Sequence, residues 1–487
     1  MKRYVVRIIS LLVLLGMMVC CFSCGVDIED DEEKSSKKSK NTVETSSAGL
    51  TLHFEKENYQ KDFNVLYFET SLYKNFYFDG ITEAGEIIEK AIFERKTLVQ
   101  DYLGVNVIGI SEGSSNAVIQ TALERDTMAG VDTYQLAPTH SYLGLSALLA
   151  GNYIMDLYEL EDISFNEEYY NLNVIDNLEV GGKAYFGSSD FIISDVCAVF
   201  FNKDMYETFQ LTENPYDLVK NGEWTLEKFK QLCSNVAIEN GDEIWDKEDT
   251  YGLGVRADWE FIPMVDACDI KWLIGSGYKT LNMGPSNQKY QDLYEWCESV
   301  IDAEWSYMYN YGDSDNKVTI ADGRFLFTME PVKYAYEHLA SDVKFGMLPY
   351  PKFDTDQQEY YTLDASGMFC VPITVTDKEM VGKVIECLSF YSADTVNVAY
   401  YERLLGTRIA DAMEDAEMLS EYIFGNITSN PAYNYSEKAT QPLGILVYTI
   451  PKMLRAKLNG DTVNTITTNW ASNRIAAQAI IDSTINR

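Results

Sequence analysis

The feature that most constrains the fold is a regular alternation of strand-like and helix-like segments between residues 63 and 150. Short apolar runs of strand length alternate with longer stretches in which apolar residues recur at helical spacing. This order is typical of a doubly wound parallel sheet, so the sequence predicts an α/β fold. Gly104 is expected to end the first helix, in a position that favours a left-handed residue. The predicted segments are strand 63–68, helix 81–103, strand 105–110, helix 115–128, strand 131–136 and helix 141–150.

The rest of the chain predicts at least one further lobe, because 487 residues are too many for a single core. A new strand is expected at 196–201, and strand character returns at 325–329 and 343–348. A mostly helical tail from residue 379 is broken by a polar loop at 425–442.

The amino terminus predicts export. Basic residues, among them Lys2 and Arg3, precede an apolar run at 8–19, which is shorter than the roughly 20 residues that span a bilayer. Ser23 and Cys24 then resemble a lipobox, although Cys21 stands where leucine is usual. We therefore expect a signal peptide at 1–23, lipidation of Cys24 and an extracytoplasmic protein anchored to the cell membrane. An ordinary cleaved signal peptide is the alternative.

A polar tether is expected to follow. Residues 24–61 hold an acidic cluster and then a stretch rich in Ser, Lys and Thr, a composition that cannot bury enough apolar surface to fold. Six cysteines lie beyond it, none of them in C-x-x-C spacing. Export permits disulfides, but the apolar neighbourhoods around Cys197 and Cys370 favour mostly free, buried thiols.

Charge and histidine content exclude several classes of function. The formal charge of −36 repels phosphate backbones, so nucleic acid is not expected as a partner, while a cationic ligand stays open. The three histidines are scattered and weigh against metallohydrolase or Ser-His-Asp chemistry. We expect no metal and no cofactor. A glycosidase, which needs only two carboxylates, is not excluded.

Four stretches resemble family 1 extracellular solute-binding proteins, the group that includes maltose- and oligosaccharide-binding proteins. The most specific is Val199-Phe-Phe-Asn-Lys-Asp-Met-Tyr206, followed by Glu223-Trp-Thr-Leu-Glu-Lys-Phe229. The others are found at 130–138, 321–329 and 345–352, in the order of the family and behind a lipobox. Together with the helix that ends near residue 103, they cover nearly all of the chain beyond the tether.

The resemblance implies a two-lobed periplasmic-binding-protein-like fold of class II, with a doubly wound sheet flanked by helices in each lobe and a hinge between them. Crossings between the lobes are expected near 190–197, 344–350 and 390–396. Lobe 1 would comprise 62–192 plus 349–392, and lobe 2 would comprise 193–345 plus 395–487.

The function that the resemblance implies is that of the monomeric solute-binding lipoprotein of an ABC importer, which is not an enzyme. Such a protein captures a mono- or oligosaccharide by hinge closure and delivers it to the permease. An anchored enzyme that acts on polysaccharide is one alternative. A binding protein for a peptide or polyamine and a sensor are the others.

A sugar needs hydrogen-bonding groups for its hydroxyls and flat rings against its apolar C–H faces. Ligands of doubly wound sheets bind beyond the carboxyl ends of strands, and further positions follow from the family resemblance. Thr139 can also be a helix cap, Asp195 a cap or a surface acid, and Trp259 a core residue. At Glu330 the chain departs from the family, which often has Gly-x-Trp there. The candidate ligand-binding residues are Glu69, Thr139, His140, Asp195, Trp259, Glu260, Glu330 and Tyr334.

Overall fold

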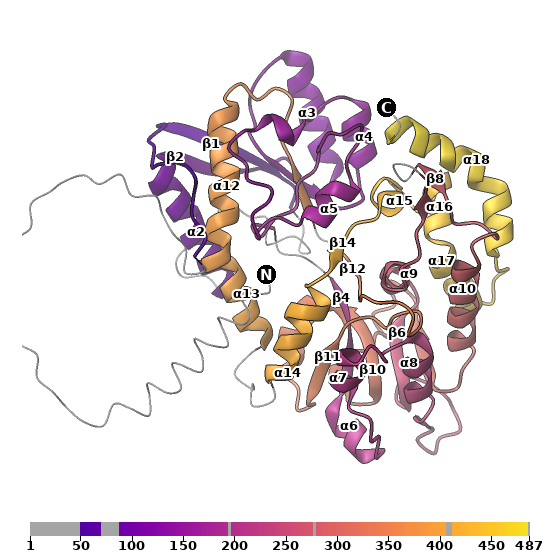
Figure 1. Cartoon of the computed structure of the whole chain (residues 1–487). Coiled ribbons are helices and arrows are strands. Elements are labelled where there is room, and N and C mark those ends of the chain that lie inside the picture. The colour runs from indigo at the N-terminus through magenta and orange to yellow at the C-terminus, as the bar shows by residue number, and fades with distance from the viewer. Residues whose placement is uncertain are drawn as a thin grey trace, which may run out of the picture.

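A computed structural model describes residues 49–69, 87–192, 196–275, 279–365, 367–405 and 412–485. It has two lobes, each organised around its own sheet (Figure 1). Lobe 1 denotes the part around β1 (Lys61–Tyr67), β2 (Val105–Ser111), β3 (Ala137–His140) and β13 (Gly367–Cys370). Lobe 2 denotes the part around β4 (Cys197–Asn202), β5 (Ala237–Ile238), β6 (Thr250–Arg256), β9 (Ser306–Tyr309), β10 (Phe325–Pro331) and β11 (Phe345–Leu348).

The sheet of lobe 1 begins with the predicted parallel pair. β1 runs parallel to β2, and a bridge between Val65 and Leu136 extends the sheet toward β3, which pairs antiparallel with β13. Helices α2 and α12 pack against each other beside it (Figure 1). Gly104 follows α2 with φ +60°, and its N–H bonds to the Gln100 carbonyl at 2.8 Å, as the sequence predicts. The helices around this sheet are α2 (Ile87–Leu103), α3 (Ala117–Ala129), α4 (Leu145–Ala150), η2 (Leu157–Glu159), α5 (Leu172–Asn177), α12 (Lys378–Asp394) and α13 (Val396–Leu405).

One predicted strand is displaced. The stretch 131–136 is irregular except for the bridge at Leu136, and the strand itself lies at Ala137–His140. Polar side chains explain the difference, because Gln135 Oε1 accepts from the Asn64 amide at 2.7 Å and Asp132 Oδ2 accepts from the Thr376 amide at 2.9 Å. These bonds hold the segment without a regular ladder.

The helix predicted at 141–150 is also shorter than expected. It begins only at Leu145, after Gly144, whose φ is +88°. Thr139 lies inside β3 opposite Met368, so it does not cap a helix.

Lobe 2 contains a mixed sheet in the order β11-β4-β10-β6-β5, with β9 beside β6. β4 is buried along its whole length and pairs antiparallel with both β10 and β11, while β10 and β6 are parallel. A small hairpin joins β7 (Leu273–Ile274) to β8 (Thr280–Leu281). The helices of this lobe are α6 (Lys203–Thr208), α7 (Pro215–Lys220), α8 (Leu226–Cys233), η3 (Trp259–Phe261), α9 (Ile262–Ala267), α10 (Gln288–Ile301), η4 (Ile320–Asp322), η5 (Val332–Tyr334) and α11 (Ala335–His338).

The carboxyl-terminal tail is mostly helical, as predicted, and runs along lobe 2, where α17 packs on α10 and α18 on β8. The polar loop expected at 425–442 contains a two-residue strand, β14, which pairs with β12, and the short helix α15. The elements from β12 onward that lie outside the two main sheets are β12 (Thr362–Leu363), α14 (Ala412–Glu417), η7 (Met418–Ile423), β14 (Ile427–Thr428), α15 (Pro431–Asn434), α16 (Pro442–Val447), α17 (Thr449–Asn459) and α18 (Ile466–Thr484).

Two residues of this tail, two positions apart, bond to lobe 1 and to another part of the tail. The Glu437 carboxylate accepts from the Gly144 and Ala147 amides of lobe 1 at 3.3 and 3.2 Å. Two residues later, the Ala439 carbonyl accepts from Lys452 Nζ of α17 at 2.6 Å. Because α17 packs on α10 of lobe 2, this short stretch lies between lobe 1 and a tail helix that covers lobe 2.

The segment before β1 is a correction to the predicted tether. Leu52 and Phe54 are buried, and the amides of Glu57 and Tyr59 donate to the carbonyls of Tyr102 and Leu103 at 3.0 and 2.9 Å. Because these two apolar side chains join the core of lobe 1, the folded body begins before residue 61. Cys24 and the tether up to residue 48 lie outside the described residues.

The lobe boundaries stay a prediction, and two stretches show contacts with the opposite lobe. The Trp224 indole of lobe 2 donates to the Pro349 carbonyl at 2.9 Å, although 349–392 is assigned to lobe 1. The Asn434 amide donates to the Ser141 carbonyl of lobe 1 at 2.7 Å, although 395–487 is assigned to lobe 2.

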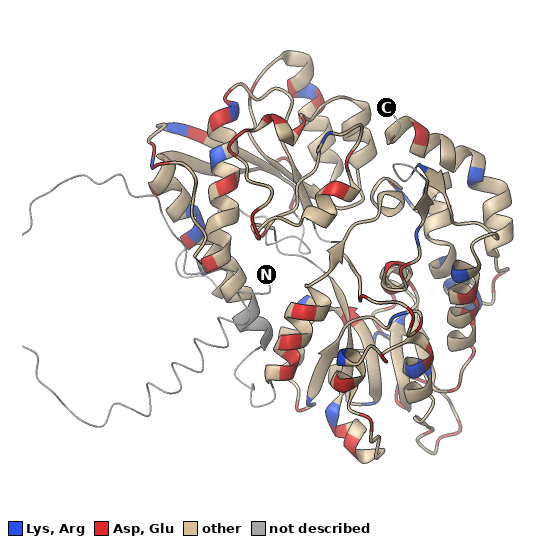
Figure 2. Ribbon diagram, in the orientation of Figure 1, with Lys and Arg blue, Asp and Glu red and all other residues tan. Residues whose placement is uncertain are grey.

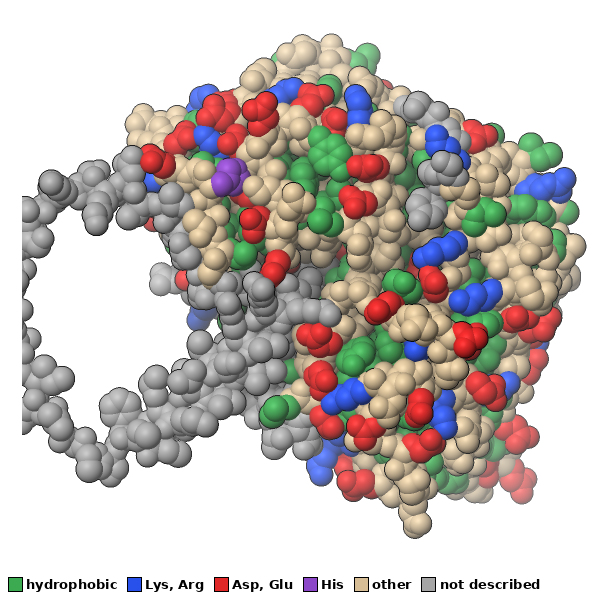
Figure 3. All heavy atoms as spheres, in the orientation of Figure 1, with side chains coloured by type: hydrophobic (Ala, Val, Ile, Leu, Met, Phe, Trp, Pro, Cys, Tyr) green, Lys and Arg blue, Asp and Glu red, His purple; other side chains and the backbone are tan. Residues whose placement is uncertain are grey.

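The six cysteines outside the leader are free and buried, as the sequence favours. None of the helices among the described residues combines the length and apolar character needed to cross a bilayer. Acidic residues occur along both lobes in the ribbon view (Figure 2), and acidic side chains outnumber basic ones on the face seen in Figure 3. This agrees with the 75 acidic and 39 basic residues of the sequence.

Candidate functional site

Aromatic residues from three parts of the chain meet where the lobes face each other. The Trp259 indole of lobe 2 donates to the Tyr433 hydroxyl of the tail at 3.1 Å. Tyr142 of lobe 1 packs on Tyr433 with ring centroids 5.1 Å apart and an interplanar angle of 30°. His140 stands edge-on to Tyr142 at 4.7 Å. We call Tyr142, Trp259 and Tyr433 the junction cluster.

Local structure fixes Trp259 at the end of a buried strand. It opens η3 directly after β6, and its neighbour Glu260 is buried. The Glu260 carboxylate pairs with Arg256 at 2.5 Å, and its backbone carbonyl accepts from the Tyr350 hydroxyl at 3.0 Å. Asp258, on the other side of Trp259, pairs with Arg455 of α17. These contacts hold the indole between two ion pairs.

Helix α15 positions Tyr433. Asn430 caps the helix through its side-chain oxygen, which accepts from the Ala432 amide at 3.2 Å. The same side chain donates to Asp266 of lobe 2 at 2.8 Å. At the other end of the helix, Asn434 donates to the Ser141 carbonyl of lobe 1. One helical turn therefore connects both lobes and carries the central ring of the junction cluster.

The titratable groups of the junction are neutral at neutral pH. Burial lowers the pKa of His140 to about 3, and the charge of Lys333 from lobe 2 lowers it further. Burial also raises the pKa values of Tyr142, Tyr433 and Tyr448, and Tyr142 and Tyr448 share a hydrogen bond. The site therefore offers phenol hydroxyls and a neutral imidazole as hydrogen-bonding groups.

Charged groups stand around this neutral centre. Burial raises the pKa of Glu260 to about 7, and its pairing with Arg256 opposes that shift. The Arg256 guanidinium lies 5.2 Å from the ring centroid of Tyr311, a side chain that is 68% exposed. Tyr311 thus adds an open aromatic face beside the junction cluster.

This arrangement suits a neutral, polyhydroxylated ligand. Flat rings can cover apolar C–H faces, while neutral hydroxyls and paired charges can exchange hydrogen bonds with ligand hydroxyls. Among the described residues, His, Cys, Asp and Glu form no group that could hold a metal ion. The described geometry is therefore a junction at which aromatic rings and neutral hydroxyls of the two lobes and the tail meet.

The structure brings three of the predicted residues together at the junction, namely His140, Trp259 and Glu260. Glu69 is exposed just after β1, and its amide donates to the Gly113 carbonyl at 2.8 Å. Thr139 is fully buried, and within the described part of the chain its hydroxyl has no hydrogen-bond partner. Asp195 lies outside the described residues.

The two predicted residues of β10 and η5 have other surroundings. Glu330 is buried and accepts from the Ile320 amide at 2.9 Å and from the Thr328 hydroxyl at 2.5 Å, and it pairs with His338 at 2.8 Å. These contacts lie within lobe 2, so the structure does not place this carboxylate at the junction. Tyr334 is half-buried, with Lys333 5.7 Å from its ring centroid.

Sequence reasoning missed the tyrosines that complete the junction. Tyr142 was within reach, because it follows His140 by two positions in the same loop. Tyr433 lies in the polar loop that interrupts the helical tail, where the run Pro431-Ala-Tyr-Asn-Tyr435 is unusually aromatic. Tyr448 and Tyr311 carry no local signal that distinguishes them from the many other tyrosines.

No protein-family model matches the sequence, and no curated protein matches it. Solved structures are nevertheless similar along most of the chain. An ABC substrate-binding protein from Listeria monocytogenes in complex with cycloalternan has a TM-score of 0.52 at 14% identity, covering 88% of this chain and 99% of the other. The GacH receptor of Streptomyces glaucescens, solved with acarbose, has a TM-score of 0.55 at 11% identity, covering 87% and 98%.

A third similar structure has a ligand of another kind. UgpB from Mycobacterium tuberculosis, in complex with glycerophosphocholine, has a TM-score of 0.54 at 15% identity and covers 81% of this chain and 95% of the other. These likenesses show that the chain adopts the two-lobed α/β fold of periplasmic binding proteins, which confirms the predicted fold class. They also agree with the resemblance that the four sequence motifs carry.

Proposed function

We propose that the protein is the solute-binding lipoprotein of an ABC importer and that it captures a small carbohydrate between its lobes. The observation that carries the proposal is the junction cluster, in which rings from both lobes and the tail converge with neutral hydroxyls. The similar structures support it, because those with cycloalternan and acarbose are binding proteins with carbohydrate-like ligands.

Capture would proceed by closure around a hinge. Trp259 belongs to lobe 2 and Tyr142 to lobe 1, so a ligand that contacts both residues binds the closed form preferentially. Such a ligand shifts the population toward closure. The handover to a permease would follow, with no covalent bond made or broken in the sugar.

The location follows from the leader. Lipidation of Cys24 would anchor the protein on the extracytoplasmic side of the membrane, and the tether would hold the lobes away from the bilayer. Feeding cells an alkyne analogue of palmitate and tagging the purified protein tests this. We expect label on the wild type and none on Cys24→Ser, and label on both proteins would contradict the assignment.

The decisive test of function is a thermal-shift screen against mono- and oligosaccharides, followed by calorimetry with the best ligand. A specific ligand at a hundredfold excess over its Kd stabilises the protein by about 2.7 kcal/mol. Chromatography of the released ligand must return the same sugar. A shortened or rearranged product would indicate the anchored enzyme instead.

Ligands of other chemistry belong in the same screen. A shift with peptides or polyamines, and none with sugars, would retain the binding fold but overturn the carbohydrate assignment. Growth of a deletion strain on the identified sugar as sole carbon source, measured together with uptake of the labelled sugar, separates import from sensing. Loss of a sensor leaves uptake intact, whereas loss of the importer's binding protein does not.

A further inference from the structure

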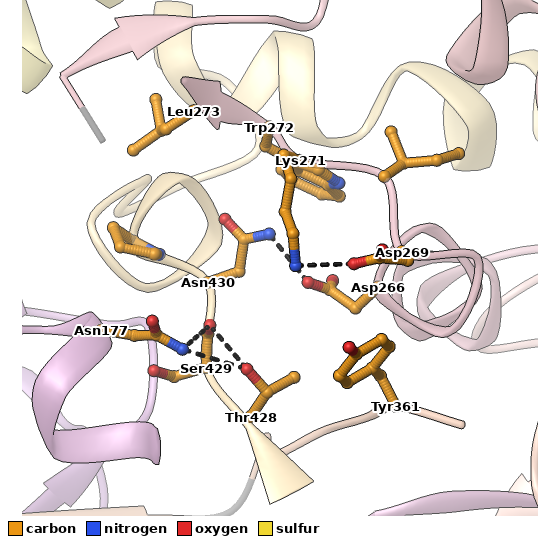
Figure 4. A pocket seen from close by; sticks show the side chains of 12 residues that line it. Asn177, Asp266, Asp269, Lys271, Trp272, Leu273, Tyr361, Thr428, Ser429 and Asn430 are labelled. Carbon is orange, nitrogen blue, oxygen red and sulfur yellow. Dashed lines mark hydrogen bonds and ion pairs between the residues drawn. The ribbon is translucent and has the colours of Figure 1, made fainter. Parts of the chain in front are cut away.

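A small cavity lies where residues of both lobes and the tail come together (Figure 4). Its volume is about 70 Å³, and its walls come from both lobes. Lobe 2 contributes residues 266–273 between α9 and β7, and lobe 1 contributes Asn177 of α5. The tail closes the cavity with residues 428–431, where Asn177 donates to the Thr428 hydroxyl at 3.1 Å.

One wall carries a buried carboxylate in which only one of the two oxygens has a hydrogen-bond partner among the described residues. Asp266 is 8% exposed, and its Oδ1 accepts from Asn430 at 2.8 Å. Its Oδ2 is buried and has no hydrogen-bond partner among the described residues. A buried carboxylate oxygen without a donor costs free energy, so this atom is a ready acceptor for a donor that enters the cavity.

The cavity is lined by more acidic than basic side chains. Asp266 and Asp269 both line it, and Lys271 is the basic residue among its lining residues. The Lys271 ammonium binds Asp269 at 2.6 Å and lies 5.2 Å from the ring centroid of Tyr361. The lining therefore holds two carboxyl groups and one ammonium, and because burial raises the pKa of Asp266 to about 7, Asp266 is about half protonated at neutral pH. A second cation beside Asp266 would favour its ionised form.

The walls favour an organic cation over a metal ion. Hard cations such as Ca²⁺ take six or more oxygen ligands, and no described group of residues is suited to a metal. Aromatic side chains line the cavity instead, with Trp272 and Tyr361 on either side of Lys271 in the view of Figure 4. Rings of this kind attract ammonium groups, and Lys271 already shows one ammonium held between an aspartate and a ring.

We propose that this cavity is an accessory site for a small primary ammonium compound, which donates to Asp266 Oδ2 and packs against Tyr361. The site is separate from the proposed sugar site and does not depend on it. Because its walls belong to both lobes, such a compound binds best when the lobes are together and favours the same form as the sugar.

The test is calorimetric titration of the purified protein with ethanolamine, without sugar. Ethylene glycol replaces the amine with a hydroxyl and serves as the neutral control, and potassium chloride controls for ionic strength. We expect ethanolamine to bind saturably, and we expect no saturable binding of ethylene glycol or potassium chloride. Asp266→Asn keeps an acceptor for Asn430 but removes the charge, so affinity should fall at least about tenfold. Glu207→Gln, an equal change of charge on the exposed side of α6, should leave binding unchanged.

Several results would overturn the proposal. Equal binding of ethylene glycol would identify a polyol site, and equal binding of potassium would identify a metal-ion site. An unchanged ethanolamine affinity in Asp266→Asn would remove the carboxylate from the site. If that variant does not fold, Tyr361→Leu provides the second test, because loss of the ring should weaken ethanolamine binding without altering the buried carboxylate.

Discussion

The Trp259 indole donates a hydrogen bond to the Tyr433 hydroxyl although 174 positions of sequence separate the two residues. One residue follows a strand of lobe 2, and the other sits on a helical turn that is tied to lobe 1. Their bond joins lobe 2 to the tail within the junction cluster. Any ligand held there must contact this pair or displace its bond.

Replacement of Trp259 with leucine should weaken sugar binding by about two- to tenfold, because an aromatic stack contributes about 0.5–1.5 kcal/mol beyond the area it buries. The side chain is only partly buried, so folding should survive. Calorimetry with the sugar found by screening measures the effect. Trp245→Leu is the matched control, since this indole is 47% exposed and packs on Tyr251. Equal affinity in the two variants would remove Trp259 from the site.

Tyr433→Phe should lower sugar affinity by about fivefold, because one hydrogen bond contributes about 1 kcal/mol and this one forms only between the lobes. Small-angle scattering should also show a larger open fraction at low ligand concentration. Tyr435→Phe is the control. Its hydroxyl donates to the Leu178 carbonyl at 2.9 Å, a contact of the tail with lobe 1 that does not involve lobe 2. A similar loss of affinity in both variants would mean that stability, not closure, is affected.

Glu330→Gln should reduce the free energy of unfolding by roughly 1–3 kcal/mol and leave sugar affinity unchanged, because its carboxylate serves Ile320, Thr328 and His338. Urea unfolding and calorimetry on the same preparations separate the two effects. If sugar affinity falls by more than the loss of folding stability accounts for, Glu330 belongs to the binding site, as the sequence analysis expects.

His140 should make the protein sensitive to acid. Its pKa is lowered from 6.5 to about 3 in the folded protein, so between these values the unfolded chain takes up a proton that the folded chain does not. The free energy of unfolding of the wild type should therefore fall as the pH drops from about 6.5 toward 3. In His140→Gln this contribution disappears, and the difference in stability from the wild type should shrink between pH 7 and pH 4.

Urea unfolding at the two pH values tests this, with His53→Gln as the control. The His53 side chain is 41% exposed, so its removal should leave the pH dependence of the wild type in place. If His140→Gln and the wild type lose stability in parallel, the imidazole is not the group responsible.

The elements that could be predicted are those whose own apolar residues form the core: β4 is buried along its whole length, and β1 and β2 bury Phe63, Val65, Val105 and Val107. The apolar runs at β1, β2 and β4 predict strands, because short apolar runs of this length fit a covered strand. The stretch 131–136 failed because Asp132 and Gln135 bond to distant partners, Thr376 and Asn64, which local periodicity does not reveal. The folded body begins before the expected end of the tether for a related reason, since Leu52 and Phe54 are buried and the amides of Glu57 and Tyr59 bond to the end of α2.

The binding residues divide in the same way. His140 lies at the end of β3, where ligands of such sheets bind, whereas Trp259 and Glu260 were expected from the family resemblance. Tyr433 reaches the junction only because Asn430 and Asn434 fix its helical turn to opposite lobes. Those contacts are tertiary, so no local sequence pattern within the tail could predict them.

The adjacent anchoring of Glu437 to α4 and of Ala439 to α17 limits how the protein can move. Two residues of extended backbone reach no more than about 7 Å, so the lobes cannot draw far apart at this spot while both contacts persist. Any opening must then be a pivot whose axis passes close by, with the widest gape at the opposite rim. If the lobes open as proposed, a rotation that keeps both contacts separates them least beside this stretch of the tail.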